Sequence, residues 1–240
     1  MFGWVKRLFS KEDAAPFFCS AVMPAAGSSS RMEGQNKLFA AVGGIPVLAR
    51  SVLALGRSEL VDEIVVAVRE QDLLAAADLL RPYDLGKPLK IVVGGKTRAE
   101  SVMAALRECS DAATLIAVHD AARPLVPLSV VETAIEKARD ALAAAPAVPV
   151  KDTIKVAEGG VVQRTPDRST LFAVQTPQVF DRDLLTGALQ AALDQQIPIS
   201  DDCSAVERLG KTVYLTAGSY ENIKITTPED LILAEAIPES

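Results

Sequence analysis

The sequence is poor in the residues from which many catalytic and metal sites are built. It contains one histidine, His119, and three cysteines, Cys19, Cys109 and Cys203, which lie far apart without the spacing of metal ligands. One histidine excludes a His-rich metal site, and no Ser-His-Asp or Cys-His arrangement for a nucleophile is present. Scattered, odd-numbered cysteines are typical of buried apolar side chains in a reducing cytosol and not of a disulfide framework.

Positive charge and long apolar runs are also scarce. The 25 Lys and Arg residues are outnumbered by 31 Asp and Glu, which gives a formal net charge of −6 and a pI near 5.0. General nucleic-acid binders carry a basic excess, so no nucleic-acid partner is expected. No apolar run reaches the ~20 residues that span a bilayer.

The first 17 residues fit no regular element of a folded domain. Lys6 and Arg7 lie among apolar residues, but no uninterrupted apolar stretch with a cleavage site follows, as a signal peptide requires. We expect a flexible extension over 1–17, with a membrane-surface helix as the weaker alternative. The remaining composition favours a cytoplasmic protein without a membrane partner.

Short apolar runs alternate along the chain with segments of helical periodicity. Buried strands are predicted at 17–23, 63–68, 89–93 and 114–118, and helices at 47–55, 71–80, 98–108 and 130–142. Capping motifs are predicted at the start of three helices, each formed by an N-cap residue and an acidic residue three positions later. The pairs are Thr97 with Glu100, Ser129 with Glu132, and Thr227, which precedes Pro228, with Asp230. The alternation predicts an α/β fold with a three-layer, Rossmann-like, mostly parallel sheet. Loops that follow the strands then gather at one edge, where ligands bind.

One segment departs from this alternation. Residues 148–174 lack helical periodicity, and 155–164 are typical of two strands joined by a turn at Glu158-Gly159-Gly160. Two strands alone are marginally stable, so the hairpin packs either on its own domain or on a second subunit. We therefore expect a single domain over 18–238, with an arm at about 150–172.

The strongest local motif follows the first predicted strand. Small side chains occupy all positions from 24 to 30, and the cations Arg31 and Lys37 come next. Small residues let backbone N–H groups approach an anion, and fixed cations balance accumulating negative charge, so the motif indicates a polyphosphate site. It matches neither the P-loop nor the dinucleotide fingerprint. An ordinary Gly/Ser-rich turn with surface charges is the alternative.

A second loop, which starts at Gly94 and Gly95, follows the strand at 89–93. Paired glycines allow close approach of the backbone to a flat ring, and backbone groups can distinguish cytosine from uracil. A tight turn closed by the Thr97 cap explains the same residues equally well.

Two further candidates lie later in the chain. Asp120 and Arg123 follow the strand that ends at Val118, and they offer a carboxylate for a hydroxyl or metal and a guanidinium for a phosphate. For His119 a structural role is favoured over that of a base. Lys224 is predicted in a short apolar strand before the last capped helix, where an exposed lysine is usually only solvated.

Six motifs occur in an order that resembles one family. They span 24–32, 94–102, 119–124, 148–155, 175–178 and 222–226. In this order they are similar to the 2-C-methyl-D-erythritol 4-phosphate cytidylyltransferase family over residues 20–236. Two departures fall in the first loop, where Ser28-Ser29-Ser30 replaces a frequent second glycine and Asn36 replaces a frequent proline before Lys37.

The resemblance implies a role for each matching residue. It implies a fold of the nucleotide-diphospho-sugar transferase type, with CTP and a sugar-alcohol phosphate as substrates. The residues implied to be catalytic are Arg31, Lys37 and Lys224. Those implied to bind the nucleotide are Pro24, Ala25, Ala26, Gly27, Gly94, Gly95, Ser101, Asp120 and Ala121. Those implied to bind the acceptor are Asp120, Arg123, Thr153, Arg168 and Thr226. Thr153 and Arg168 would act in the partner's site of a homodimer formed through the arm.

The expected reaction is direct in-line attack of 2-C-methyl-D-erythritol 4-phosphate on the α-phosphorus of CTP, which releases pyrophosphate for isoprenoid precursor synthesis. Positioning and charge stabilisation suffice, because the acceptor phosphate is already ionised. Mg²⁺ is expected mainly on the triphosphate, since no carboxylate cage for a metal is evident. The alternatives are a ribitol 5-phosphate cytidylyltransferase and, from another class, a non-catalytic nucleotide-binding module. A Rossmann-type oxidoreductase is disfavoured because the glycine fingerprint is missing.

Overall fold

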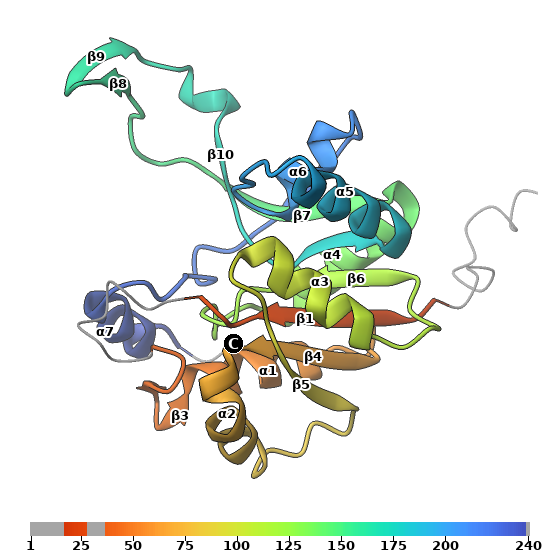
Figure 1. The fold of residues 1–240 in the computed structure, drawn as a ribbon. Helices are drawn as coiled ribbons and strands as arrows, with labels where there is room; N and C mark the ends of the chain where they lie inside the picture. The colour runs from red at the N-terminus through yellow and green to blue at the C-terminus, as the bar shows by residue number, and fades with distance from the viewer. Residues whose placement is uncertain (1–16, 28–36, 239–240) are drawn as a thin grey trace, which may run out of the picture.

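A central β-sheet organises the computed structural model, which describes residues 17–27 and 37–238 (Figure 1). Its strands follow the order β10-β7-β11-β6-β1-β4-β5, and β12 also pairs with β7. The bounds are β1 Cys19–Pro24, β4 Glu63–Val68, β5 Leu89–Val93, β6 Leu115–Val118, β7 Ala143–Pro149, β10 Phe172–Val174, β11 Gln178–Asp181 and β12 Tyr214–Ala217. A small separate pair, β2 (Ala41–Val42) and β3 (Ile45–Pro46), precedes the first helix.

The centre of the sheet is parallel, as predicted. Strand β1 pairs in parallel with β4 and with β6, and β4 pairs in parallel with β5. Strand β11 runs antiparallel between β6 and β7. The carboxyl ends of β1, β4, β5 and β6 therefore meet at one edge, and the loops that follow them can form a common site.

Helices cover both faces of this sheet and complete three layers. The helices are α1 Val47–Gly56, α2 Leu73–Leu80, α3 Arg98–Glu108, α4 Leu128–Ala141, α5 Arg182–Asp194, α6 Asp202–Arg208 and α7 Pro228–Ala236. Residues of α1, α2, α4 and α7 belong to one hydrophobic core, and residues of α3, α5 and α6 belong to the other.

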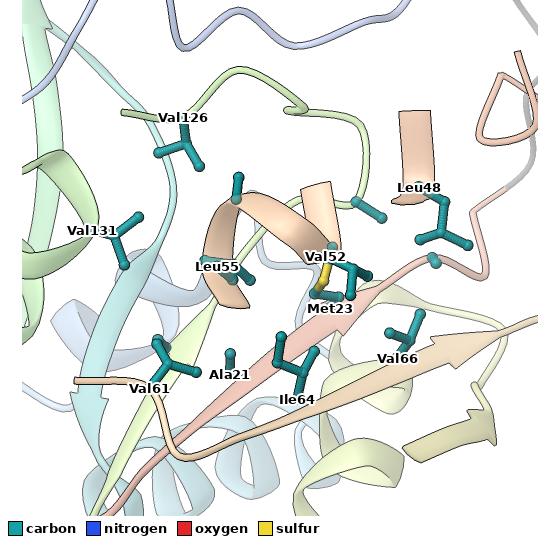
Figure 2. Packing of buried hydrophobic residues seen from close by; sticks show 14 of the residues in the cluster. Ala21, Met23, Leu48, Val52, Leu55, Val61, Ile64, Val66, Val126 and Val131 are labelled. Carbon is teal, nitrogen blue, oxygen red and sulfur yellow. The ribbon is translucent and has the colours of Figure 1, made fainter. Parts of the chain in front are cut away.

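The side chains of β1 alternate between these two cores. Ala21 and Met23 pack with the core that contains α1, as Figure 2 shows, whereas Val22 packs with the core of α3. All three side chains are fully buried. Successive side chains of a strand point to opposite faces, so a strand covered on both sides is apolar throughout. This explains why the central strands appear in the sequence as unbroken apolar runs.

The structure corrects two predictions around α4. The helix starts at Leu128 with Pro127 as its N-cap residue, so Ser129 lies inside the first turn and makes no cap. Proline fixes φ near the value that starts a helix, which moves the start ahead of the predicted position. The helix ends at Ala141, because Leu142 adopts a left-handed conformation with φ 66°.

A third correction concerns the strand predicted around Lys224. Residues 221–227 form no strand in the structure, and Ile225 N–H donates a single sheet-like bond to Ala122 O at 2.8 Å. The predicted start of α7 is confirmed: the Thr227 N–H donates to the Asp230 carboxylate at 2.9 Å, and Pro228 opens the helix.

The hairpin is confirmed as an arm that projects from the body of the molecule (Figure 1). Strands β8 (Val156–Glu158) and β9 (Val161–Arg164) pair in antiparallel fashion. Gly159 and Gly160 have φ 55° and 80°, a conformation that glycine adopts without strain and that two-residue hairpin turns require. Every residue of both strands is exposed.

Candidate active site

A cavity of about 200 Å³ opens at the carboxyl ends of β1, β5 and β6. It brings together ten of the residues predicted for the site: Pro24, Ala25, Ala26, Gly27, Lys37, Gly95, Ser101, Asp120, Ala121 and Lys224. Leu38, Lys96, Thr97, Arg98 and Ala122 complete its lining. Arg31 and Ser28-Ser29-Ser30 lie outside the described residues, so the geometry of the first loop is described only up to Gly27.

The first two loops of the cavity touch one another. Gly94 itself does not line the cavity, but a Cβ added to it would lie 2.9 Å from the Cβ of Ala26 and 3.0 Å from Oγ of Ser101. At Gly95 an added Cβ would lie 2.2 Å from the Cβ of Glu100. These glycines therefore allow close packing of the loop against α3 and against the first loop, in addition to any approach of a nucleobase.

The start of α3 is fixed by a capping box. Thr97 N–H donates to the Glu100 carboxylate at 2.8 Å, and Glu100 N–H donates to Thr97 Oγ1 at 3.2 Å. Ser101 Oγ accepts the Gly95 N–H at 3.1 Å and donates to Thr97 O at 2.8 Å. The buried Ser101 hydroxyl thus holds the loop to the helix and leaves the side chain at the cavity wall.

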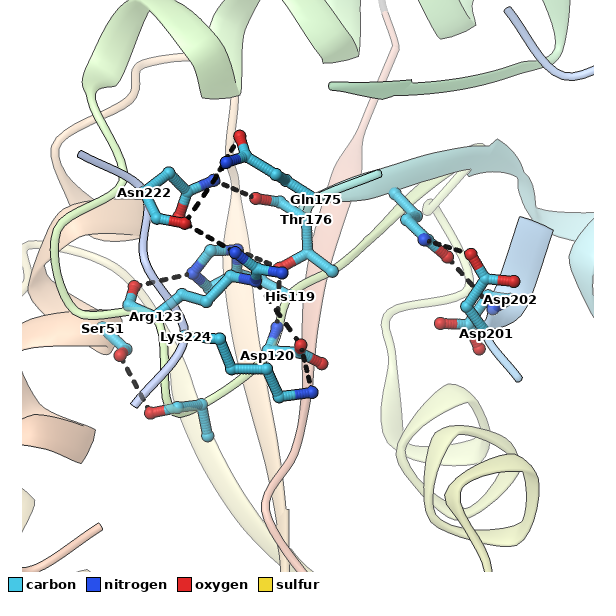
Figure 3. Close-up of polar contacts among 12 residues, drawn as sticks. Ser51, His119, Asp120, Arg123, Gln175, Thr176, Asp201, Asp202, Asn222 and Lys224 are labelled. Atoms are coloured by element: carbon cyan, nitrogen blue, oxygen red, sulfur yellow. Dashed lines mark hydrogen bonds and ion pairs between the residues drawn. The ribbon is translucent and has the colours of Figure 1, made fainter. Parts of the chain in front are cut away.

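Asp120 is the centre of the charged groups in the cavity (Figure 3). Its Oδ2 lies 2.8 Å from Lys224 Nζ and 3.5 Å from Arg123 Nε. Its Oδ1 lies 2.7 Å from Arg98 Nη1. Burial alone would raise the pKa of Asp120, but the charges of Arg98 and Lys224 outweigh it and hold the pKa well below its ordinary value. Asp120 is therefore a carboxylate at neutral pH, and its oxygens are occupied by cations.

Arg98 is a residue of the site that the sequence argument missed. It is the first residue of α3, and its guanidinium bridges two carboxylates, with Nη2 at 2.7 Å from Asp202 Oδ2. Burial lowers the pKa of Arg98, but Asp202 and Asp120 outweigh this effect and raise the pKa above its ordinary value. Its position three residues after Gly95, at the junction of a strand and a helix, was the available signal.

The structure supports the structural role of His119. The ring is fully buried, with Nε2 at 3.1 Å from Arg123 O and Nδ1 at 3.0 Å from Thr176 Oγ1 (Figure 3). Burial lowers the pKa of His119 to about 4, so the ring is neutral at pH 7. Because it lies beneath the loop and does not line the cavity, it holds the backbone in place and is not positioned as a base.

Four other predicted residues do not line this cavity in the single chain. Arg123 lies behind Asp120 and donates from Nη1 to Asn222 O at 2.6 Å. Thr226 donates both its N–H and its hydroxyl to the Asp230 carboxylate at the start of α7. Thr153 and Arg168 lie on the exposed arm, where Arg168 Nη1 donates to Lys151 O at 2.7 Å.

Neither a protein-bound metal centre nor a membrane span emerges within residues 17–27 and 37–238. This part of the chain contains no group of three or more His, Cys, Asp or Glu side chains arranged to hold a metal ion. None of its helices has the length and apolar character needed to cross a bilayer. Asp120 is the one acidic residue among the described residues of the cavity lining, and it is ion-paired.

Comparison with known proteins gives one consistent result. Residues 19–240 match the family model described as IspD: 2-C-methyl-D-erythritol 4-phosphate cytidylyltransferase. The protein of that name from Halalkalibacterium halodurans is 44% identical over 219 residues, which cover 91% of this chain and 96% of the relative. The one from Caldanaerobacter subterraneus is 44% identical over 90% of this chain and 96% of its own length.

Solved structures agree with these relatives. The 4-diphosphocytidyl-2C-methyl-D-erythritol synthase of Anaerococcus prevotii superposes with a TM-score of 0.81 at 32% identity, covering 92% of this chain and 97% of that one. The 2-C-methyl-D-erythritol 4-phosphate cytidylyltransferase of Thermus thermophilus gives a TM-score of 0.76 at 34% identity, with coverages of 92% and 98%.

Proposed function

The chain belongs to the 2-C-methyl-D-erythritol 4-phosphate cytidylyltransferase family, and on that premise we propose that it transfers CMP from CTP to 2-C-methyl-D-erythritol 4-phosphate in isoprenoid precursor synthesis. The observation that supports this most directly is the cavity at the sheet edge. There a small-residue loop, Lys37 and the Lys224–Asp120 pair face the same space. Such a site suits a triphosphate on one side and an acceptor on the other.

The chemistry is a single in-line displacement. An oxygen of the acceptor phosphate forms a bond to the α-phosphorus of CTP, while the bond from that phosphorus to the β-phosphate bridging oxygen breaks and pyrophosphate leaves. A phosphate monoester is ionised at neutral pH, with its second pKa near about 6, so no strong base has to remove a proton. The neutral, buried His119 agrees with such a mechanism, because the cavity lacks its ring.

We assign the cations to the transferring phosphate. Arg31 and Lys37 follow the small-residue loop in the sequence and would bind the triphosphate. Lys224, which is remote from them in the sequence, lines the same cavity as Lys37. Fixed cations stabilise charge that develops at the reacting phosphate without reorganisation during the step. Pro24 to Gly27 would cradle the nucleotide, and Gly95 and Ser101 would contact cytosine. Asp120, Arg123 and Thr226 are proposed for the acceptor.

The proposed cofactor is Mg²⁺ bound mainly through the triphosphate. When bound, it would neutralise and orient phosphate oxygens. The donor set agrees with binding of this kind, because Asp120 is the acidic group of the described cavity lining and its oxygens already meet Arg98 and Lys224. The chain's own contribution is then cationic positioning, from Lys37 and Lys224.

We further propose a homodimer through the arm, with Thr153 and Arg168 entering the partner's cavity. Ile154, Val161 and Val162 are large apolar side chains on the arm, and the exposed fraction of Val161 is 64%. A two-stranded hairpin without a packing surface is marginally stable, so a second subunit would supply the surface that the arm lacks here. Cys19, Cys109 and Cys203 are buried free thiols, which suits the proposed cytoplasmic location.

An acceptor panel tests the function. Release of pyrophosphate is measured with CTP or UTP against 2-C-methyl-D-erythritol 4-phosphate or ribitol 5-phosphate. Turnover with CTP and the methylerythritol phosphate, and much less with the other three pairs, is the expected result. Turnover only with ribitol 5-phosphate would replace the acceptor in this proposal, and CTP binding without pyrophosphate release from any acceptor would point to a non-catalytic module.

A further inference from the structure

A fully buried carboxylate lies behind the cavity and belongs to none of the roles described above. Asp202 is the first residue of α6, its side chain has 0% exposure, and its Oδ2 lies 2.7 Å from Arg98 Nη2. The backbone N–H of Asp202 donates to Gln178 Oε1 at 3.0 Å, which ties the start of α6 to β11. Asp202 is therefore held on a rigid part of the body, while Arg98 reaches from it to the cavity wall.

The buried Asp202 carboxylate does not contribute favourably to the stability of the fold. Its Oδ1 is buried and has no hydrogen-bond partner among the described residues, and burial raises its pKa despite the neighbouring charge of Arg98. A buried carboxylate with an unmatched oxygen costs folding free energy. The unmatched oxygen and the fixed bridge to Arg98 indicate that the group serves the arrangement of its neighbours.

The charges form a chain from Asp202 into the cavity. Asp202 binds one nitrogen of the Arg98 guanidinium, and the other nitrogen binds Oδ1 of Asp120. This fixes the plane of the Asp120 carboxylate and leaves Oδ2 for Lys224 Nζ at 2.8 Å. The planar guanidinium of Arg98 holds its two carboxylate partners in a fixed orientation as well as balancing their charge. A lysine ammonium at the same position would balance charge without fixing that orientation.

We infer that Asp202 is a positioning residue for the transfer step: through Arg98 and Asp120 it sets where the Lys224 ammonium lies in the cavity. The inference rests on the proposed function, because it assigns Lys224 to the reacting phosphates. Asp202 touches no substrate. Its effect is to hold one cation at a fixed point while the negative charge of the transition state develops.

Loss of the Asp202 charge breaks the first ion pair in the series that runs from Asp202 through Arg98 and Asp120 to Lys224. The Arg98 guanidinium keeps Asp120 as its remaining anion and can rotate about it, so Oδ2 and the Lys224 ammonium lose their fixed position. Within the described residues the bonds of Asp202 are to Arg98 and Gln178 and not to the loops at Gly27 and Gly95, so we expect binding of the nucleotide to change little. We expect the change in kcat and not in the KM for CTP. A mutation far from the reacting atoms that displaces a catalytic group by about 1 Å can slow the chemical step up to about a hundredfold.

The primary test compares Asp202→Asn with Asp201→Asn. Asp201 lies at the same helix start and bonds Ser204 N and Gln178 Nε2, but makes no bond to Arg98. Pyrophosphate release with CTP and the methylerythritol phosphate is measured alongside the thermal unfolding midpoint. We expect kcat to fall between about tenfold and a hundredfold in D202N, with the KM for CTP within about twofold, and near-normal kcat in D201N. Near-normal kcat in a folded D202N would overturn the inference.

A double-mutant cycle separates positioning from general damage to the fold. If Asp202 acts through Lys224, adding Asp202→Asn to Lys224→Gln lowers kcat little further, whereas independent effects would multiply. Should D202N not fold, Arg98→Lys replaces it in the cycle, since one ammonium cannot bridge both carboxylates. Multiplying effects would refute the inference. Absence of any turnover in the wild-type chain would instead refute the proposed function, so the two failures are distinguishable.

Discussion

The Lys224 ammonium lies 2.8 Å from Oδ2 of Asp120, where it is both paired and open to the cavity. The lysine side chain is 43% exposed and the aspartate side chain 9% exposed. The pair joins a loop after β6 to the segment before α7, which are far apart in the chain. An ammonium held in this way can meet an incoming phosphate without first being ordered, which is the property that electrostatic catalysis requires.

Lys224→Ala should therefore slow turnover and leave the fold intact. Loss of one preorganised cation costs ~3 kcal/mol of transition-state stabilisation, or at least about a hundredfold in kcat. Asp120 keeps Arg98 and Arg123 as partners, so no buried charge is left unpaired. Kinetics of pyrophosphate release give the effect, and Lys211→Ala, at an exposed lysine, is the matched control. Near-normal turnover of the Lys224 variant would remove that residue from the mechanism.

The cations after the first loop carry a parallel prediction. Arg31→Ala and Lys37→Ala should each lower kcat by at least about a hundredfold, because each removes a charge assigned to the triphosphate. Lys37 lines the cavity, and Arg31 lies outside the described residues. Turnover at saturating CTP is the measurement, because a residue that contributes only ground-state affinity would raise KM and leave kcat unchanged.

Gly95→Ala tests whether the second loop needs its close contact with α3. A Cβ at this position would lie 2.2 Å from the Cβ of Glu100 and 3.1 Å from its backbone carbon, so the loop must move. We expect a loss of about 1–3 kcal/mol in the free energy of unfolding, together with a higher KM for CTP. Gly187→Ala is the control: nothing lies within 4 Å of its added Cβ, and alanine in helix α5 should raise stability by up to about 1 kcal/mol. Equal changes in the free energy of unfolding and in the KM for CTP for both substitutions would show that the close contact of Gly95 with α3 is not required.

The sequence predicted the central strands well for a physical reason. The bounds of β4 and β5 coincide with the predicted 63–68 and 89–93. Strand β4 is buried along its whole length and is apolar from Ile64 to Val68, because helices cover both faces of the sheet there, whereas the edge strand β5 is half-buried or exposed and still keeps a mostly apolar run around Lys90. Strand β7 was not predicted, since Ala143 to Val148 offers small residues that favour no period. Its strand conformation comes from pairing with β10, β11 and β12, which no local pattern contains.

The same distinction holds in the site. The small-residue loop and the paired glycines stand out locally, because their backbone needs restrict the residue types allowed. The link from Asp202 to Arg98 does not, since it joins the starts of two helices that lie far apart in the sequence and meet only in the folded sheet. The same limit applies to Lys224, whose partner Asp120 lies on a loop remote from it in the chain.

His119 predicts a pH dependence of stability. Its pKa falls from 6.5 to about 4 in the folded state because the ring is buried. The unfolded chain binds a proton in this window and the folded chain does not, so the free energy of unfolding decreases as the pH falls from 6.5 to 4. A shift of this size corresponds to about 3 kcal/mol, since one pKa unit is about 1.4 kcal/mol. Denaturant unfolding at several pH values measures the slope.

His119→Gln isolates this contribution. Glutamine can still bond Arg123 O but does not titrate, so the slope between pH 6.5 and 4 should flatten. Two buried carboxylates, Asp120 and Asp202, contribute to the pH dependence of stability equally in the wild-type chain and in the variant. The lowered pKa of Asp120 makes stability fall mainly below pH 3.8, whereas the raised pKa of Asp202 acts in the opposite sense above that value. An unchanged slope in the variant would show that the ring is not held neutral by the fold.

The arm makes a prediction that concerns two chains at once. If Arg168 acts in the partner's cavity, a Lys224→Ala chain has a defective cavity and an intact arm, and an Arg168→Ala chain has the reverse. Each homodimer is then impaired at both sites. A mixed dimer contains one site with the intact cavity of one chain and the intact arm of the other, which restores function at that site.

Mixing equal amounts of the two variants under conditions of subunit exchange should therefore restore activity. Random assortment gives about half mixed dimers, each with one intact site of two, so about a quarter of wild-type turnover is expected. A chain that carries both substitutions, mixed with the Lys224→Ala variant, is the control and should recover nothing, because no intact cavity is present. If Arg168 acted in its own chain, the single variants would remain as impaired after mixing as before, and the arm would have to be assigned to assembly alone.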